Sequence, residues 1–360
     1  MDYKDRLARA RLALEQSRLD ALLITHLPNI SYLCGFTGSA GVLVVSQSEY
    51  VFFTDGRYTE QAHQEVKGVR IKILQGKSAP AAAANWMATQ KSLRRIGIGA
   101  AHMTVAERGA FAKALPRKAR LVAAPAIVER MRMVKDPEEI AKIRAACHLG
   151  VALFDRLLRV VRPGVSETQV AGELEFEARR LGADQMAFST IIAGGRRSAL
   201  PHGRASQAKL PLRGFVVCDF GVILANYCSD MTRTLHLGRP PMEARRVYQA
   251  VREAQQAALD AVKPGVTVGE VDGAARKSLQ KHGLGKFFTH STGHGVGLEI
   301  HESPRIAAGQ MDLLQPGMVI TIEPGVYLPG KVGIRIEDTV VVTDSGCEIL
   351  TPCPKDLVVV

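Results

Sequence analysis

The sequence predicts an α/β domain over residues 1–130, followed by a duplicated α+β domain over residues 131–360. The chain has 360 residues, which is long for a single hydrophobic core and favours two domains. In the first third, short apolar runs alternate with helical stretches, which is typical of an α/β layer. In the remainder, a helical segment at 161–182 recurs at 262–283, which indicates an internal duplication.

Composition argues against a nucleic-acid or membrane partner. Net charge is +12, but the basic residues are scattered, and a dense patch such as 117–120 is short. No N-terminal apolar signal segment and no apolar run of membrane-spanning length occurs. The six cysteines form no CxxC pair, so we expect free thiols and a cytoplasmic location.

The first domain begins with a predicted helix at 4–18, where leucines recur among charged residues. Runs of β-type residues then predict strands, and turn-forming segments separate them. The predicted strands are 21–25, 41–46 and 50–54, and the predicted helices are 58–67, 80–93 and 104–114.

A long helix is predicted over residues 137–161. Asp136 can cap it, Pro137 suits its first turn, and the glutamates that follow stabilise the positive end of the helix dipole. Apolar residues then recur at three- and four-residue spacing until a Pro-Gly pair ends the helix.

The duplication extends beyond the repeated helix. Residues 161–182 and 262–283 keep the same Val, Pro and Gly positions, and each copy follows a long helix. Two β-rich runs come after each copy, and these runs are 216–221 and 227–234, then 320–325 and 334–342. We therefore expect two halves that face each other across a pseudo-twofold axis, although chance similarity between two helical segments is the alternative.

Each β-rich run carries a carboxylate in an otherwise apolar setting. A buried carboxylate is costly unless it is paired with a cation or binds a metal. Salt bridges to Arg233 or Arg335 are one interpretation, and a shared metal site is the other. Asp338 directly follows the last of these acids, so strand alternation predicts that it points to the other face. The four acids are Asp219, Asp230, Glu323 and Glu337.

The stretch THSTGHGVGLEIHE at 289–302 adds three histidines separated by glycines. Histidine is a common metal ligand and proton carrier, and glycine allows the backbone to approach a ligand closely. His301 also stands in the second half about where His202 stands in the first. A polar loop with solvated histidines is the competing interpretation of this stretch taken alone.

Four acids that meet between the two halves would repel one another unless cations lie among them. Four carboxylates and one histidine are too acidic for a Cys/His zinc site. They suit two divalent ions, with Mn²⁺ favoured and Co²⁺ or Zn²⁺ possible. Two such ions can activate a water molecule as a nucleophile at neutral pH.

Asp219, Asp230, His294, Glu323 and Glu337, within DFG, SDMTRT, STGHGVG, EPGVY and RIED, resemble the ligand set of the pita-bread metallopeptidases. That family includes methionine aminopeptidase, aminopeptidase P, prolidase and creatinase. NISYLCGFTGSAG and FFTDGRY resemble the creatinase-type N-terminal domain. SALPHGRAS and HSTGHGVGLEIHE are most similar to bacterial Xaa-Pro peptidases. Together with the N-terminal motifs, the resemblance covers nearly the whole chain.

The resemblance implies a homodimer with a pita-bread catalytic domain, which cleaves proline-containing peptides as an Xaa-Pro aminopeptidase or dipeptidase. The five ligand residues would hold two metal ions, and Glu323 would also carry a proton. His202 and His301 would bind the scissile peptide and stabilise its oxyanion. His290 would line the proline pocket, and Arg335 would orient ligands or the substrate. A creatinase-like C–N hydrolase and a non-catalytic scaffold are the alternatives.

Overall fold

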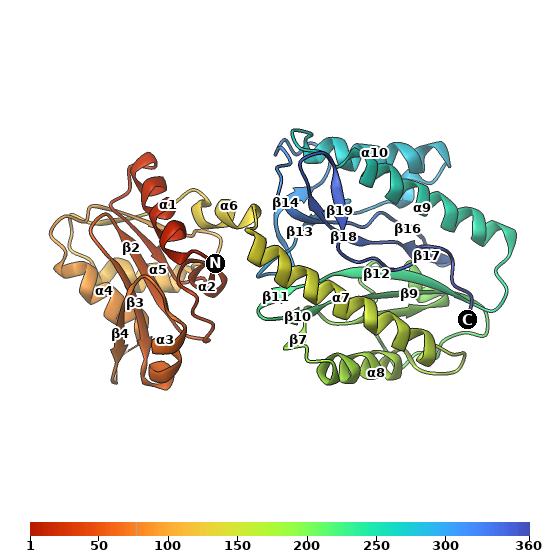
Figure 1. The fold of residues 1–360 in the computed structure, drawn as a ribbon, viewed down its shortest axis with the longest axis horizontal. Helices are drawn as coiled ribbons and strands as arrows, with labels where there is room; N and C mark the ends of the chain where they lie inside the picture. The colour runs from red at the N-terminus through yellow and green to blue at the C-terminus, as the bar shows by residue number, and fades with distance from the viewer. Residues whose placement is uncertain (77) are drawn as a thin grey trace. The chain divides into compact units, whose positions relative to one another are not determined.

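The computed structural model describes residues 1–76 and 78–360. The chain divides into two compact units, Met1–Arg132 and Met133–Val360, both drawn in Figure 1. The first unit mixes helices and strands in alternation, and the second pairs helices with antiparallel strands. The predicted fold class, an α/β N-terminal domain followed by a duplicated α+β domain, is therefore confirmed.

The N-terminal unit is built on one six-stranded mixed sheet, with strand order β4-β3-β2-β1-β5-β6. Strands β1, β5 and β6 are parallel neighbours, whereas β1, β2 and β3 pair antiparallel. The helices are α1 (Tyr3–Gln16), α2 (Leu27–Cys34), α3 (Thr59–Glu65), α4 (Ala79–Thr89), α5 (Val105–Ala114) and α6 (Ile127–Met133). The strands are β1 (Ala21–Ile24), β2 (Val42–Ser46), β3 (Tyr50–Asp55), β4 (Arg70–Leu74), β5 (Arg95–Ile98) and β6 (Arg120–Ala123).

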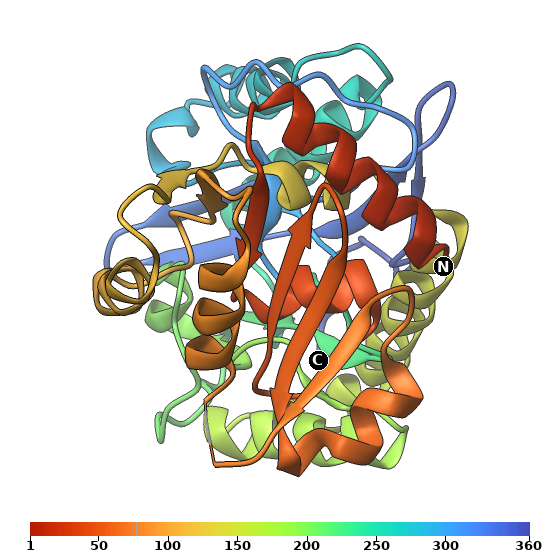
Figure 2. The same ribbon diagram turned by 90° about the vertical axis from the view of Figure 1, so that its left-hand side faces the viewer.

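Both faces of this sheet are covered. Val44 of β2 packs with Trp86 of α4 and Phe111 of α5 in one hydrophobic cluster. Leu43, which points to the other side of the same strand, is also fully buried. Figure 2 shows the strands of this unit turned toward the viewer, with α1 in red beside them. The near-continuous apolar runs of the sequence therefore form a sheet buried on both sides.

The C-terminal unit contains two copies of a helix pair followed by paired antiparallel strands. In the first copy β9 pairs with β12, and in the second β15 pairs with β18. Figure 1 shows α8 on one side of the strands and α9 and α10 on the other. The first copy uses α7 (Pro137–Val160), α8 (Glu167–Arg180), β9 (Gly214–Phe220) and β12 (Met231–Leu237). The second uses α9 (Met242–Ala261), α10 (Val268–Lys281), β15 (Val319–Ile322) and β18 (Asp338–Val342).

The retained glycines of the repeat make the same turn in both copies. Gly164 has φ of +81° and Gly265 has φ of +80°, a region that L side chains rarely adopt. The N–H of Gly164 donates to the Leu210 carbonyl, and that of Gly265 donates to the Leu314 carbonyl. The helix that follows begins with a capping box in both copies, Ser166 with Gln169 and Thr267 with Glu270. The sequence repeat is thus a structural repeat.

Three of the four predicted β-rich runs are broken, which corrects the expectation of continuous strands. The run at 320–325 leaves β15 after Ile322, and Gly325 begins β16 (Gly325–Leu328) in another sheet. The run at 334–342 divides into β17 (Val332–Arg335) and β18, which belong to different sheets. The run at 227–234 divides into β11 (Tyr227–Cys228) and β12. At the break between β17 and β18, the Glu337 N–H donates to the Thr232 carbonyl of the opposite half. Asp230 and Glu337 lie at these breaks because the chain there leaves one strand to bond across the pseudo-twofold interface.

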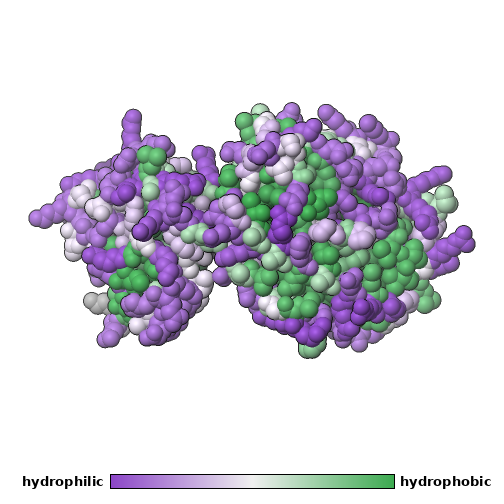
Figure 3. Space-filling view, viewed as in Figure 1, coloured by the Kyte–Doolittle hydropathy of each residue, from purple (hydrophilic) through white to green (hydrophobic). Residues whose placement is uncertain are grey.

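The remaining strands of the C-terminal unit extend the sheets of β9 and β15 or form two further sheets. Figure 3 shows hydrophobic residues gathered on the C-terminal unit, whereas hydrophilic residues dominate the visible face of the N-terminal unit. Among the described residues, no helix combines the length and apolarity needed to cross a membrane. The other strands are β7 (Gln185–Met186), β8 (Ile191–Gly194), β10 (Val222–Leu224), β13 (Gly293–Gly295), β14 (Glu302–Ile306), β16 (Gly325–Leu328) and β19 (Cys347–Ile349).

Candidate active site

One cavity of about 770 Å³ in the C-terminal unit contains every site residue proposed from the sequence. Both halves contribute to it, since β9 and the start of β12 face β13, the end of β15 and the break between β17 and β18. The lining therefore lies where the duplicated strand pairs meet. The predicted residues that line it are His202, Asp219, Asp230, His290, His294, His301, Glu323, Arg335 and Glu337.

Burial and mutual repulsion keep three of the acids from ionising easily. Burial raises the pKa of Asp230 well above its ordinary value, and the charges of Glu337, Asp219 and Glu323 add to this. The pKa of Glu323 is raised in the same way, by burial and then by Glu337. Burial and Asp219 raise the pKa of Glu337 to about 8, although Arg335 acts against them. The site therefore gathers acids that its own residues do not allow to ionise fully, and a bound cation would favour their ionised form.

The donor atoms of the site fit a metal ion. Asp230, His294 and Glu337 each offer a ligand atom, and these atoms lie within 4.8 Å of one another. Oδ1 of Asp219 and Oδ1 of Asp230 are buried and accept no hydrogen bond from the described residues. A buried carboxylate oxygen without a donor carries the full cost of lost hydration, which a cation would offset.

His294 presents one ring nitrogen to the acids. Its Nδ1 lies 3.0 Å from the Gly295 carbonyl, so Nδ1 carries the hydrogen and Nε2 keeps a lone pair. That Nε2 is 3.6 Å from Asp230 Oδ2 and 3.6 Å from Glu323 Oε1. Burial lowers the pKa of His294 to about 4, which keeps the ring neutral at pH 7. A β-carbon at Gly293 would lie 1.9 Å from the Thr321 carbonyl oxygen, so glycine is required beside this histidine.

Arg335 is held by protein groups on several sides. Its Nη2 pairs with Asp219, its Nε donates to Thr232 at 3.1 Å, and its Nη1 donates to Tyr327 at 2.6 Å. Tyr327 in turn donates to His290 Nε2 at 2.9 Å, since His290 Nδ1 donates to the Ser291 carbonyl. Of the salt bridges considered from the sequence, Arg335 therefore pairs with one of the four acids. One guanidinium cannot neutralise four carboxylates.

His202 and His301 stand at the exposed side of the cavity. Both residues are solvent-accessible, in contrast to the buried acids behind them. Partial burial, followed by the nearby charge of His202, lowers the pKa of His301. The ring of His301 meets the ring of His294 edge to face at 4.3 Å between centroids. A neutral imidazole at this position keeps one N–H to donate.

Sequence reasoning missed several residues that shape the site. Tyr327 connects Arg335 to His290, and it lies within the motif EPGVY whose acid was noticed. Thr232, two residues after Asp230, donates a hydrogen bond to Glu337 Oε2 at 2.7 Å. Strand alternation from Asp230 could have identified Thr232, whereas the Tyr327 contact requires the fold. Two further arginines, a phenylalanine and an isoleucine also line the cavity, and these are Arg204, Arg305, Phe188 and Ile300.

Comparison with protein families accounts for both units. The model of metallopeptidase family M24 matches residues 141–344, which is more than half of the chain. The model of the creatinase/prolidase N-terminal domain matches residues 6–134. The match to a metallopeptidase family is consistent with the cavity, in which Asp230, His294 and Glu337 offer ligand atoms for a metal ion.

Relatives align with the chain over nearly its whole length. A Xaa-Pro dipeptidase of Pyrococcus horikoshii is 34% identical over 350 residues, 96% of this chain and 96% of the relative. The structure of a Xaa-Pro dipeptidase from Bacillus anthracis is 37% identical with a TM-score of 0.96 and covers 100% of both chains. An X-Pro aminopeptidase structure from Thermotoga maritima is 37% identical with a TM-score of 0.88, over 97% of this chain and 100% of that one. The chain therefore belongs to metallopeptidase family M24, with a creatinase/prolidase N-terminal domain and a pita-bread catalytic domain.

Proposed function

We propose that this protein is a metal-dependent Xaa-Pro peptidase, which hydrolyses the bond between an N-terminal residue and proline. The observation that carries the proposal is the convergence of the nine predicted site residues in one cavity. The chain that holds this cavity aligns over nearly its whole length with proteins named Xaa-Pro dipeptidase.

The five ligands in this proposal are Asp219, Asp230, His294, Glu323 and Glu337, and they would hold two divalent ions. An oxygen-rich set of this kind matches Mn²⁺ best, with Co²⁺ or Zn²⁺ as substitutes. When bound, the ions supply Lewis acidity, which activates water and polarises the scissile carbonyl. The two buried carboxylate oxygens without hydrogen-bond donors support this assignment.

Glu323 would move the proton that the reaction requires. The nitrogen of an Xaa-Pro bond has no hydrogen, so it must gain one proton as the C–N bond breaks. Glu323 lies directly after β15 and reaches the same cavity as the other acids. It would take a proton from the attacking water and deliver it to the proline nitrogen.

The histidines would act on the substrate in two ways. His202 and His301, on the exposed side of the cavity, would donate hydrogen bonds to the carbonyl oxygen as negative charge develops there. His290 uses both ring nitrogens on Ser291 and Tyr327, which leaves its ring surface for the apolar proline ring. Arg335 would act indirectly, because its nitrogens orient Asp219 and Tyr327.

Two arginines favour a dipeptide as the substrate. Arg204 and Arg305 line the cavity, and neither forms an ion pair with a carboxylate in residues 1–76 or 78–360. A dipeptide ending in proline carries a free carboxylate next to the scissile bond, and an arginine fork binds carboxylates in bidentate fashion. Longer peptides, as in an aminopeptidase, would lack that charge next to the proline.

A peptide panel tests the function and the length preference together. Chelator-treated protein should be inactive and should release the first residue of Xaa-Pro once Mn²⁺ is added back. Arg305→Ala or Arg204→Ala should raise KM for Xaa-Pro by about 10- to 100-fold, as expected for loss of a hydrogen bond to a charged group. KM for the C-terminal amide of the same dipeptide should change little.

Arg196→Ala provides a matched control, because Arg196 is exposed and lies outside the cavity lining. Inactivity of the Mn²⁺-loaded protein on both Xaa-Pro and Xaa-Pro-Xaa would rule out the proposed function. Equal efficiency on both peptides, with no KM change in either arginine variant, would favour the aminopeptidase.

Metal binding should release protons at neutral pH. Glu337, with a pKa of about 8, is largely protonated at pH 7 in the metal-free protein and must lose its proton to bind a cation. Because this pKa is raised from 4.5, Glu337 contributes stability below pH 4.5 that is lost as pH rises to about 8. The free energy of unfolding of the metal-free protein should therefore fall between pH 4.5 and about pH 8. Mn²⁺ should restore stability above that range.

Calorimetric titration of Mn²⁺ in buffers of different ionisation enthalpy measures the released protons. We expect at least one proton per chain at pH 7 and fewer at pH 9. A titration without proton release at pH 7 would contradict the raised pKa values.

Metal content separates the proposal from its competitors. About two ions per chain bound in the cavity of the C-terminal unit would support the enzyme, whereas a scaffold would retain none there. A small-molecule amide screen on metal-loaded protein would detect a creatinase-like hydrolase. A homodimer and a cytoplasmic location stay predictions.

A further inference from the structure

A second group of metal-binding side chains lies in the N-terminal unit. One ring nitrogen of His26, one ring nitrogen of His102 and one carboxylate oxygen of Glu129 lie within 4.8 Å of one another. All three residues are partly buried and none lines the cavity of the C-terminal unit. We propose that His26, His102 and Glu129 bind a single transition-metal ion, with Zn²⁺ as the best match.

The sheet topology explains why these distant residues meet. His26 follows β1, His102 follows β5, and Glu129 lies on α6, which follows β6. Strands β1, β5 and β6 are parallel neighbours, so their carboxyl ends share one edge of the sheet. In α/β sheets, that edge is where ligands commonly bind. The arrangement follows from the fold and brings together residues from three separate segments of the chain.

The side chains are held in place by further hydrogen bonds. The two imidazole rings stack at 3.7 Å between centroids with planes 11° apart, so one ring must turn for both in-plane lone pairs to face a single ion. His102 Nε2 lies 3.1 Å from Glu129 Oε1. Asn29 Nδ2 donates to the same oxygen at 2.7 Å, and Arg132 donates to Asn29 Oδ1 at 2.7 Å. Because Arg132 fixes which end of the amide faces Glu129, the carboxylate is oriented as it is in many metal sites.

The size of the cavity decides what kind of ligand can enter. The space beside these residues has a volume of about 20 Å³. One water-sized body needs about 10–15 Å³, so the space admits a single ion or water and excludes an organic ligand. The side chains of His102 and Glu129 are each 25% exposed, which leaves a route from solvent.

The ligand chemistry selects the type of ion. Two imidazoles and one carboxylate, with a fourth position for water, form a set that suits Zn²⁺. Mg²⁺ and Ca²⁺ prefer all-oxygen sites, so they match this site poorly. A bound ion would join the segments after β1 and β5 to α6 and so stabilise the folded N-terminal unit by mass action. The purely structural alternative is a His102–Glu129 ion pair beside a stacked histidine.

Zinc counting on the full-length protein tests the proposal. Chelator-treated protein is loaded with Zn²⁺, freed of excess metal by gel filtration and analysed by elemental analysis. His26→Gln, His102→Gln and Glu129→Gln should each retain one zinc fewer per chain than the unmodified protein. His63→Gln is the matched control, because His63 is an exposed histidine on α3 of the same unit. It should retain the full number.

Co²⁺ absorption and peptidase activity are two further measurements on the same variants. Co²⁺ should give absorption bands that His102→Gln lacks and His63→Gln keeps. Activity with Mn²⁺ should be unchanged in all four variants, so failure of the proposed peptidase function is distinguishable from failure of this site. Circular dichroism shows whether each variant is folded. Because each ligand is removed in a separate variant, two variants still test the site if the third does not fold. Equal zinc retention and equal Co²⁺ spectra in the folded variants would overturn the proposal.

Discussion

Asp230→Ala is expected to abolish peptidase activity while the protein stays folded. Asp230 Oδ1 is buried without a hydrogen-bond donor, and burial with the charges of Glu337, Asp219 and Glu323 raises the pKa of Asp230. Removing it therefore relieves repulsion in the metal-free protein and loses a ligand in the metal-loaded one. Lewis-acid stabilisation worth several kcal/mol corresponds to a fall in kcat/KM of about a thousandfold or more.

The measurement is kcat/KM on an Xaa-Pro dipeptide with Mn²⁺, together with metal content and urea unfolding of the metal-free form. Asp344→Ala serves as the control, because Asp344 is exposed in the turn after β18. It should leave activity and metal content unchanged. A fully active Asp230→Ala protein with its full metal content would contradict the ligand assignment.

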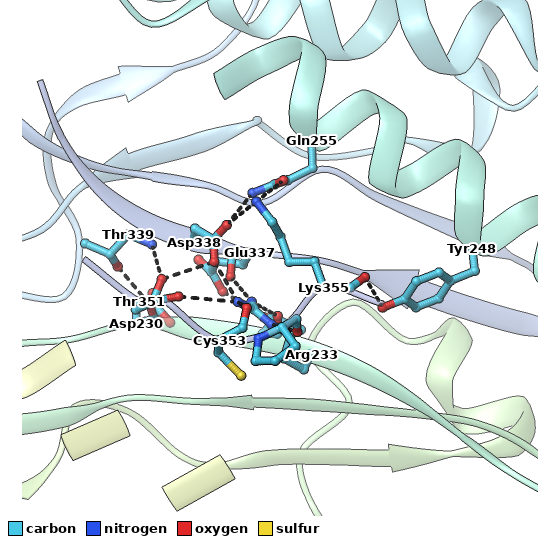
Figure 4. A network of polar contacts seen from close by, with 12 residues as sticks. Asp230, Arg233, Tyr248, Gln255, Glu337, Asp338, Thr339, Thr351, Cys353 and Lys355 are labelled. Carbon is cyan, nitrogen blue, oxygen red and sulfur yellow. Dashed lines mark hydrogen bonds and ion pairs between the residues drawn. The ribbon is translucent and has the colours of Figure 1, made fainter. Parts of the chain in front are cut away.

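Asp338→Ala is expected to destabilise the protein by about 3–5 kcal/mol, the cost of removing one partner from a buried ion pair. Asp338 Oδ1 accepts from Arg233 at 2.7 Å and from Thr351 at 3.2 Å. Its Oδ2 accepts from Lys355 at 2.9 Å and from Gln255 at 2.8 Å. Figure 4 shows these groups converging on the carboxylate. Without Asp338, the Arg233 guanidinium, which is only 2% exposed, would stay buried and lose its counter-ion.

The same network supports the active site from behind. Arg233 also donates to the Glu337 carbonyl and to the carbonyls of Cys353 and Pro354, so it joins the C-terminal tail to a proposed ligand. As alternation predicted, Asp338 has its partners on the other face from Glu337. We therefore expect Asp338→Ala to weaken Mn²⁺ binding as well as stability.

The pH dependence of this effect has a definite sign. Burial alone would raise the pKa of Asp338, but the charges of Arg233 and Lys355 outweigh it and hold the pKa below 3.8. A depressed pKa contributes stability above the unfolded pKa and loses it as pH falls through the folded value. The stability difference between the unmodified protein and Asp338→Ala should be full at pH 7 and shrink below about pH 4.

Urea unfolding at pH 7 and pH 3 measures both expectations. The double variant Arg233→Met with Asp338→Leu should recover much of the loss, because it removes both buried charges. A single Asp338→Ala variant within about 0.5 kcal/mol of the unmodified protein, typical of a surface substitution, would show that the pair is not a stabilising contact.

The duplication and its consequences could be predicted from the sequence because they rest on local rules. Gly164 and Gly265 adopt positive φ, and the helices after them begin with capping residues. Because these positions favour particular residue types, the repeat can be recognised in the sequence. An acid in each of four apolar runs can also be recognised from the sequence, because a carboxylate in such a run is costly to bury unless it is paired or binds a metal. The fold class and the four acids of the site followed from these signals, whereas the roles of the histidines and of Arg335 came from the resemblance to a known family.

Contacts between residues far apart in the chain were decided only by the tertiary structure. The breaks that place Asp230 and Glu337 at strand ends arise because the backbone there bonds across the two halves. Tyr327 became visible as the link from Arg335 to His290 only when β16 and β17 paired. The cluster of His26, His102 and Glu129 likewise exists because three parallel strands end at one edge. Local pattern determines which residues each strand carries, whereas sheet pairing determines which side chains meet.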